Sequence, residues 1–212
     1  MQRFDRPRRI FAIALAGLAG FVDAAGFLSA GGYFVSFMSG NTTRLAVDLA
    51  TRPPHAIVPA LLIFGFVAGV AAGTVVSGKA GSRRKPAVLA LVVAFLAMAA
   101  TVRAWGFAEA SIGGLVMAMG ALNTTFQRNG EVAVGLTYMT GALVRIGQGL
   151  GAALLGRGGG NWRSFLGLWS GLAAGAVAGA VAWSRWEAGC LWLAACWAAA
   201  MLVVALRLPA EA

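Results

Sequence analysis

The side chain with the clearest chemical potential in this sequence is the carboxyl group of Asp23, which lies within the apolar run 10–28. A carboxylate is costly inside a membrane helix and is by default a functional candidate there. It would suit a proton-sensitive or cation-sensitive role, with Arg44 or Arg145 as its partner. Two structural interpretations remain open, namely a buried ion pair and a carboxylate close enough to the outer surface to be hydrated.

Two short polar turns, 101 residues apart, form the second candidate group. The string Met-Ser-Gly-Asn at 38–41 precedes Arg44, and the string Met-Thr-Gly-Ala at 139–142 precedes Arg145. Both turns combine a hydroxyl group, a glycine and a nearby cation, which is suitable for binding a small polar or anionic solute. The candidate solute-binding residues are Asp23, Ser39, Gly40, Asn41, Arg44, Thr140, Gly141 and Arg145.

A helix is predicted after each turn, with Ser39 and Thr140 as the caps. Residues 33–38 are expected to descend as extended chain, so that the turn lies near the membrane centre. Helix N-termini present free N–H groups and partial positive charge, which favour an anion or an acceptor-rich solute. The two turns are therefore expected to face each other and line a central site. Alternatively, they only anchor their loops, and each arginine is satisfied by carbonyl groups or reaches the surface.

A ladder of small residues repeats at almost the same distance as the turns. It makes one smooth helix face, as at close contacts between membrane helices. We expect the runs 56–77 and 164–183 to pack by these faces, against each other or against the half-helices, and a homo-oligomer could also form through them. Repeated membrane units often build transport proteins. The ladder is Gly65, Gly69, Gly73 and Ser77, and its copy is Gly167, Gly171, Gly175 and Gly179.

Composition predicts an all-α membrane protein in contact with the lipid bilayer. Apolar residues make up 59% of the 212 residues and charged residues only 11%, against a norm of about 25% charged in soluble proteins. Residues 1–212 are interpreted as one membrane domain, with repeats at about 10–104 and about 110–206. Six runs are long enough to cross about 30 Å of hydrocarbon: 10–28, 56–77, 86–104, 110–127, 164–183 and 188–206.

Basic residues orient these spans by the positive-inside rule. The clusters before the first span and at 79–85 both belong in the cytoplasm, as does the C-terminus with Arg207. Segments 29–55 and 128–163 must then begin and end on one side, as re-entrant loops with half-helices. Three crossings per repeat put the two halves in opposite senses, which is an inverted repeat. A bacterial inner-membrane location follows, with both termini cytoplasmic.

Several function classes are disfavoured by the same residues. The net charge of +10 sits in short gaps between apolar runs, so topology explains it better than nucleic-acid binding. The sequence has no Ser/His pair within reach and no Gly-rich phosphate motif, so an intramembrane enzyme is a weak alternative. No metal-ligand spacing surrounds the two cysteines, and no cofactor is expected.

Three strings in the first half, together with parts of the second, resemble the signature of the bacterial YoaK family of membrane proteins. They are Gly-Phe-Val-Asp-Ala at 20–24, Gly-Tyr-Phe at 32–34 and the turn at 38–41, and the second-half parts are 123–128 and 138–145. The family's turn usually has threonine where this chain has Ser39, which keeps the hydroxyl group. The resemblance implies a bacterial inner-membrane protein of about six helices and supplies no substrate or activity.

From these residues we expect a transporter or channel for a small polar or anionic solute. The alternative is a membrane scaffold, assembly partner or sensor without a path for solute. A continuous polar cavity that reaches both turns would favour the first function over the second.

Overall fold

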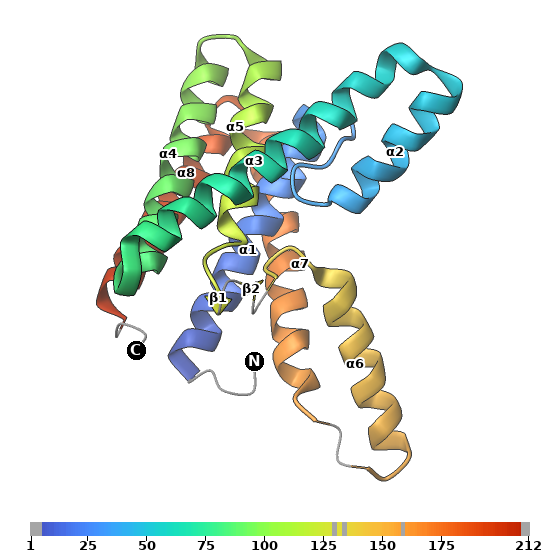
Figure 1. The fold of residues 1–212 in the computed structure, drawn as a ribbon, viewed down its shortest axis with the longest axis vertical. Helices are drawn as coiled ribbons and strands as arrows, with labels where there is room; N and C mark the ends of the chain where they lie inside the picture. The colour runs from blue at the N-terminus through green and yellow to red at the C-terminus, as the bar shows by residue number, and fades with distance from the viewer. Residues whose placement is uncertain (1–5, 129–130, 133–134, 158–159, 209–212) are drawn as a thin grey trace.

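The computed structural model of the protein describes residues 6–128, 131–132, 135–157 and 160–208. They form α-helices joined by short turns, with one antiparallel pair of two-residue strands (Figure 1). The elements are α1 (Arg6–Ser29), α2 (Met38–Thr51), η1 (Pro53–Ala56), α3 (Ile57–Ala80), η2 (Gly81–Arg83), α4 (Arg84–Ala104), α5 (Ala108–Leu122), β1 (Gln127–Arg128), β2 (Glu131–Val132), α6 (Met139–Leu154), α7 (Trp162–Arg185) and α8 (Glu187–Arg207).

The six predicted apolar runs fall in α1, α3, α4, α5, α7 and α8. The helix α5 ends at Leu122, before the predicted boundary near 127, because residues 123–126 form turns. Its 15 residues rise about 22 Å, less than the helix length usual for a membrane span. Four segments of the described chain are long and apolar enough to cross a membrane, and the second contains both α3 and α4: Arg6–Ser29, Pro53–Ala104, Trp162–Arg185 and Gly189–Arg207. The chain is therefore an all-α membrane protein.

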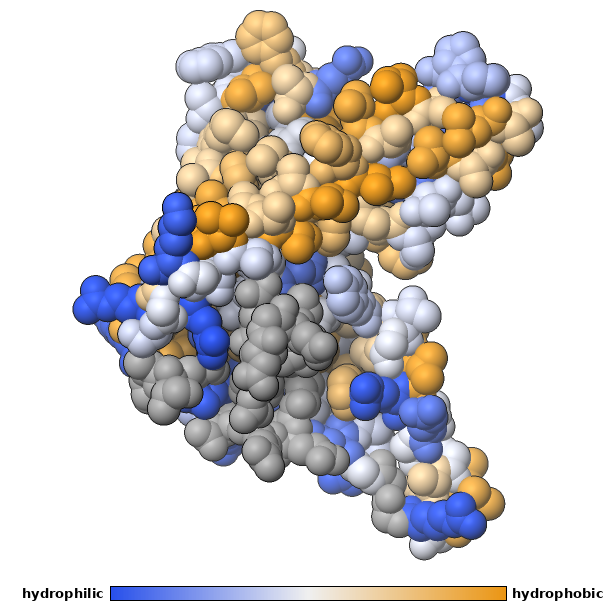
Figure 2. Space-filling model, in the orientation of Figure 1, coloured by the Kyte–Doolittle hydropathy of each residue, from blue (hydrophilic) through white to orange (hydrophobic). Residues whose placement is uncertain are grey.

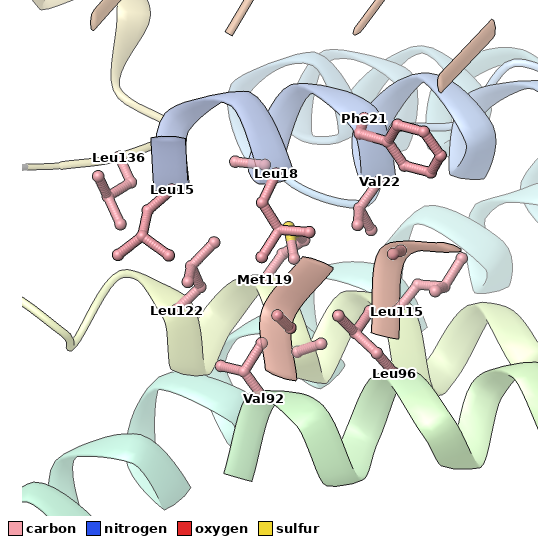
Figure 3. Packing of buried hydrophobic residues seen from close by; sticks show 14 of the residues in the cluster. Leu15, Leu18, Phe21, Val22, Val92, Leu96, Leu115, Met119, Leu122 and Leu136 are labelled. Carbon is pink, nitrogen blue, oxygen red and sulfur yellow. The ribbon is translucent and has the colours of Figure 1, made fainter. Parts of the chain in front are cut away.

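The centre of the molecule is built on α1 and α5. The helix α1 packs on α7, α5 packs on α3 and α4, and α1 and α5 also contact each other. Figure 3 shows Leu15 and Leu18 of α1 pointing toward Met119 and Leu122 of α5, and all four side chains are fully buried. On the far side of α5, Leu96 of α4 continues the same layer.

The glycine ladders pack as smooth faces, but not against the partners that the sequence suggested. A Cβ atom on Gly69 would lie 2.3 Å from the carbonyl oxygen of Met117 in α5, and one on Gly175 would lie 1.9 Å from that of Gly17 in α1. The predicted packing of 56–77 against 164–183 or the half-helices through these faces is thus wrong. Both α1 and α5 carry small residues of their own, Gly17 and Gly120 among them, and these let the backbones approach.

Helix contacts in the two halves of the chain correspond to each other. Exchanging α1–α4 with α5–α8 turns the α1–α7 contact into α3–α5, α4–α5 into α1–α8, α2–α3 into α6–α7, and α3–α4 into α7–α8. The remaining helix pairs, α1–α5 and α4–α8, are unchanged by the exchange. Every contact between described α-helices therefore has a counterpart in the other half.

The helices α2 and α6 lie outside this centre. Among the described elements, α2 contacts η1 and α3, and α6 contacts α7. In Figure 1 the pairs α2–α3 and α6–α7 leave the centre as two diverging arms, and α2 and α6 both begin near mid-height. Figure 2 shows a hollow on this side of the molecule between the arms. The two half-helices thus have much of their surface free of protein contacts.

Candidate functional site

The candidate site consists of two matched segments at the starts of α2 and α6, which we call the first tip (residues 34–41) and the second tip (residues 135–142). The chain reaches the first tip through a turn at Gly31 and Gly32, whose φ angles of 62° and 92° are readily available only to glycine. From residue 33 to residue 37 the chain has neither helix nor strand, with bends at Val35 and Ser36. The predicted fully extended descent is therefore replaced by a bent one.

Asp23 holds the first tip through backbone N–H groups. Its Oδ1 atom accepts a hydrogen bond from the N–H of Val35 at 3.0 Å and another from the N–H of Ser36 at 2.8 Å. When the carboxyl group is ionised, such bonds are charge-assisted and stronger than neutral ones. The carboxylate of α1 thus satisfies donors in a segment that lacks regular secondary structure.

Asn41 makes a second, reciprocal connection within the first tip. Its Oδ1 accepts from the N–H of Phe34 at 3.1 Å, and its Nδ2 donates to the carbonyl oxygen of Phe34 at 2.7 Å. The side chain is completely buried. The amide of Asn41 therefore pairs with the backbone of Phe34 as a neighbouring strand would. Its own polar groups are satisfied inside the protein.

Aromatic rings cover the outside of the first tip. The ring of Phe34 lies 5.0 Å from that of Phe27 and 5.2 Å from that of Phe37, between ring centres. The guanidinium carbon of Arg44 lies 5.0 Å from the centre of the Tyr33 ring. Arg44 is therefore held against an aromatic face by a cation–π contact.

The second tip uses the same construction with an uncharged residue. The Nδ2 of Asn123 in the turn after α5 donates to Thr137 Oγ1 at 3.1 Å, and its Oδ1 accepts from the N–H of Thr137 at 3.4 Å. Thr137 lies 101 residues after Ser36, so Asn123 is the counterpart of Asp23. The second half therefore has an uncharged amide where the first half has a carboxyl group.

The two arginines do not pair with Asp23 in the part of the chain that the structure describes. Arg44 stacks on Tyr33, and Arg145 lies 5.0 Å from the centre of the Phe165 ring on α7. Asp48, four residues beyond Arg44, forms its ion pair with Arg52 at 3.0 Å. The predicted Asp23–arginine ion pair is thus replaced by bonds to backbone N–H groups.

Both helix caps lie two residues before the predicted ones. The helix α2 begins at Met38 and α6 at Met139, so Ser39 and Thr140 lie within the first turn. The residues before these helices, Phe37 and Tyr138, make no side-chain cap hydrogen bond. Ser39 and Thr140 are exposed, as is Gly141, whereas Gly40 is half-buried.

The structure brings the first-half candidates together but does not join the two tips. Asp23, Asn41 and Arg44 all bond or stack within the segment from 33 to 36. Among the described elements, α2 and α6 have no contact with each other. The described residues hold no cluster of His, Cys, Asp or Glu suited to a metal ion.

The sequence did not identify Phe34 and Thr137 as site residues. Phe34 exchanges backbone hydrogen bonds with the Asn41 amide, and Thr137 bonds the Asn123 amide through its N–H and its hydroxyl group. The signal was present in the repeat, because Ser36 and Thr137 are 101 residues apart and Asp23 and Asn123 are 100 apart. Extending the alignment of the halves to Ser36 and Thr137 would have paired Asp23 of α1 with the first tip and Asn123, which follows α5, with the second.

Comparison with known proteins places the chain in a family of membrane proteins. Residues 11–204 match the family described as "Protein of unknown function (DUF1275)". The chain is 41% identical over 199 residues to the UPF0700 transmembrane protein RA0705 of Rhizobium meliloti (strain 1021), covering 92% of this chain and 85% of that protein. No solved structure matches the chain. Since the family match extends over nearly all of its helices, this chain belongs to the DUF1275 family.

Proposed function

We propose that this protein passes a small polar or anionic solute across the membrane, as a transporter or channel. The observation that carries the proposal is the pair of exposed half-helix starts, where Ser39 and Thr140 lie in first turns without a side-chain cap. First-turn N–H groups attract anions and acceptor atoms. The N–H groups of Met38, Gly40 and Met139 already donate to carbonyl oxygens within the tips. A solute near mid-height would therefore meet the other first-turn N–H groups, such as those of Ser39 and Thr140.

The proposed architecture is six crossings in two inverted repeats, each with a re-entrant half-helix. Three features support it: the helix contacts that correspond between the halves, the matched bonds of Asp23 and Asn123, and the short lengths of α2 and α6, 14 and 16 residues. Helices of this length rise about 21–24 Å and fall short of a full crossing. The two tips would then meet the membrane from opposite sides.

Charge supports the proposed orientation in a bacterial inner membrane, with both termini cytoplasmic. In Figure 1 the start of α1, the end of α8 and the end of α6 lie in the lower part of the molecule. The connection between α3 and α4 carries Arg83, and the one after α6 carries Arg157. The positive-inside rule assigns such loops to the cytoplasm. The opposite end carries Glu109 and Glu187 beside Arg103 and Arg185.

Arg145 gives a further argument for a wet surface between the arms. It is exposed in the second turn of α6, and its guanidinium carbon lies 5.0 Å from the centre of the Phe165 ring. A guanidinium facing hydrocarbon at this depth would cost at least about 2.5 kcal/mol. Water or solute beside Arg145 removes that cost.

The alternative function is a scaffold or assembly partner. It is favoured by the absence of contact between α2 and α6 among the described elements, since two separated tips enclose no site within one chain. A second protein or a second copy of the chain would then occupy the hollow of Figure 2.

Thiol accessibility tests the proposal. Ser39→Cys and Thr140→Cys are suitable because both side chains are exposed, whereas a Cβ on Gly40 would lie 2.6 Å from the Phe37 ring. The background would carry Cys190→Ala and Cys196→Ala, and Arg52→Cys and Arg157→Cys would report on exposed loops. Membrane-impermeant maleimide would be added to right-side-out and to inside-out vesicles.

Labelling at both tips, each from one side only, together with faster osmotic swelling of proteoliposomes in glycerol, urea or sodium acetate, is the expected result. Unlabelled tips beside labelled loop controls would overturn the proposal in favour of the scaffold. Labelled tips without swelling in any of these solutes would restrict the function to binding.

A further inference from the structure

The two tips are built on one plan but are held with unequal strength. The first tip receives four hydrogen bonds from two side chains, two through Asp23 Oδ1 and two through the amide of Asn41. In the second tip, Ala142 occupies the position of Asn41 and has no polar side chain. The backbone of Gly135, which corresponds to Phe34, therefore has no such side-chain partner at residue 142.

The packing of side chains around the two tips is also unequal. In the first tip a Cβ on Gly40 would lie 2.6 Å from the ring of Phe37 and 2.9 Å from that of Phe34, so the rings close over the turn. At Gly141 of the second tip no atom beyond its own helix backbone lies within 4 Å of that position. The Tyr138 ring lies instead against Gly135, where a Cβ would be 2.1 Å from it. The second tip has glycine in place of Phe34, so the three-ring arrangement cannot form there.

Fewer contacts hold the second tip in place. Leu136 is buried in the core, and the side chain of Asn123 contacts Thr137 through distances of 3.1, 3.3 and 3.4 Å. These are uncharged pairs at the long end of the hydrogen-bond range, whereas the bonds to Asp23 are 2.8 and 3.0 Å and involve a carboxylate. Releasing the second tip therefore breaks fewer and weaker interactions.

We infer that the second tip opens and closes while the first tip stays fixed, and that Asp23 and Asn41 are the positioning residues responsible for the difference. In its link to solute passage, this inference rests on the proposed function. With the end of α6 placed at the cytoplasmic surface, the moving tip belongs to the half-helix that enters from the cytoplasm. The protein would then be a one-sided gate in spite of its repeated plan.

Hydrogen exchange measured by mass spectrometry on the full chain in lipid nanodiscs tests the inference without any solute. The protection factors of residues 34–36, corrected for intrinsic rates, are expected to exceed those of 135–137 by at least about tenfold, because local opening must break more bonds. Asn41→Ala is expected to remove at least about tenfold of the protection at 34–36. Ala142→Asn is expected to raise protection at 135–137.

Thr42→Ala is the matched control, because Thr42 is exposed on the same helix and its hydroxyl group donates to the carbonyl oxygen of Met38 within its own turn. Equal protection of the two tips in the native chain, or higher protection of the second, would overturn the inference even if Asn41→Ala failed to fold. The exchange comparison and the thiol labelling have separate readouts. If the tips differ in protection but are not labelled, the inference stands and the proposed solute passage is wrong. If the tips are equally protected but are labelled, the proposed solute passage stands and the inference is wrong.

Discussion

The packed centre and the two outlying half-helices differ in what holds them. In the centre, α1 meets α7 and α5 meets α3 through glycines, at distances that leave no space for a Cβ atom on Gly175 or Gly69. Lipid tails are as apolar as leucine, so close packing rather than exclusion of water must supply much of the attraction there. The half-helices instead depend on a few polar side chains.

This difference separates a frame from a working part. Contacts between smooth faces extend along whole helices, and no single side chain controls them. The tips depend on individual bonds from Asp23, Asn41 and Asn123, which can be broken locally. A mutation in the centre should therefore affect the whole fold, whereas a mutation at a tip should affect one segment.

The largest effect is expected for Gly175→Leu. A Cβ alone would lie 1.9 Å from the carbonyl oxygen of Gly17, and all three of its nearest atoms belong to backbone that cannot rotate away. Separating α1 from α7 should cost more than about 3 kcal/mol and abolish the folded protein. Fluorescence-detected size exclusion in detergent would show loss of the monodisperse peak.

Gly147→Leu is the matched control for this substitution, because no atom lies within 4 Å of a Cβ at Gly147 on α6. If Gly175→Leu and Gly147→Leu gave the same profile, the packed centre would not depend on close backbone contact. The contrast between centre and half-helix would then be wrong.

The next effect is expected for Asp23→Ala. It leaves the N–H groups of Val35 and Ser36 without their acceptor, and each lost partner costs about 1–3 kcal/mol. Asp23→Asn keeps an acceptor oxygen, as Asn123 does in the second half, and should cost about 1 kcal/mol. Thermal unfolding in detergent and exchange at residues 34–36 would measure both.

An unchanged exchange rate at 34–36 in Asp23→Ala would show that the first tip is held by other contacts. Equal effects of the alanine and asparagine variants would show that the negative charge matters more than the acceptor geometry. Asp23 would then again be a candidate for a proton-sensitive group.

Much of the fold was predictable because it follows from apolar length. Runs such as 56–77 and 164–183 are apolar enough to specify helices, and α3 and α7 extend them by only a few residues at the ends. The repeat of Gly69 and Gly73 as Gly171 and Gly175 likewise predicted close packing of helix backbones. Which helix would fill each face was not predictable, since a smooth face specifies proximity and not a partner.

The tips were predicted by position but not by contact. Two polar turns followed by helical spacing correctly indicated that the short helices α2 and α6 begin there. The bonds of Asp23 depend on how the segment around Val35 folds back on α1, which no local pattern encodes. An arginine is the usual expectation for a membrane carboxylate, and backbone N–H groups took that place because the bent segment left them free.

A smaller effect is expected for Asn123→Ala in the second tip. The side chain donates to the carbonyl oxygen of Met119 at 3.0 Å and bonds Thr137 on the other side. Its loss should cost about 2 kcal/mol, with the increase in exchange confined to residues 135–137. Exchange at 34–36 serves as the internal control, and a rise in both tips would mean that Asn123 stabilises the frame as well.

The smallest effect is expected at the rim, for Glu187→Gln. Arg103 Nη2 lies 2.5 Å from Glu187 Oε1, but the carboxylate side chain is 63% exposed and therefore screened by solvent. The loss in free energy of unfolding should be about 0.5 kcal/mol and should vanish in high salt.

Trp183→Leu, which removes the ring 4.3 Å from the Arg103 guanidinium, should cost more, about 1 kcal/mol, and should depend less on salt. Thermal unfolding at low and at 1 M salt distinguishes the two, and a larger loss for Glu187→Gln would mean that charge pairing, rather than packing, closes the frame where α4 meets α8.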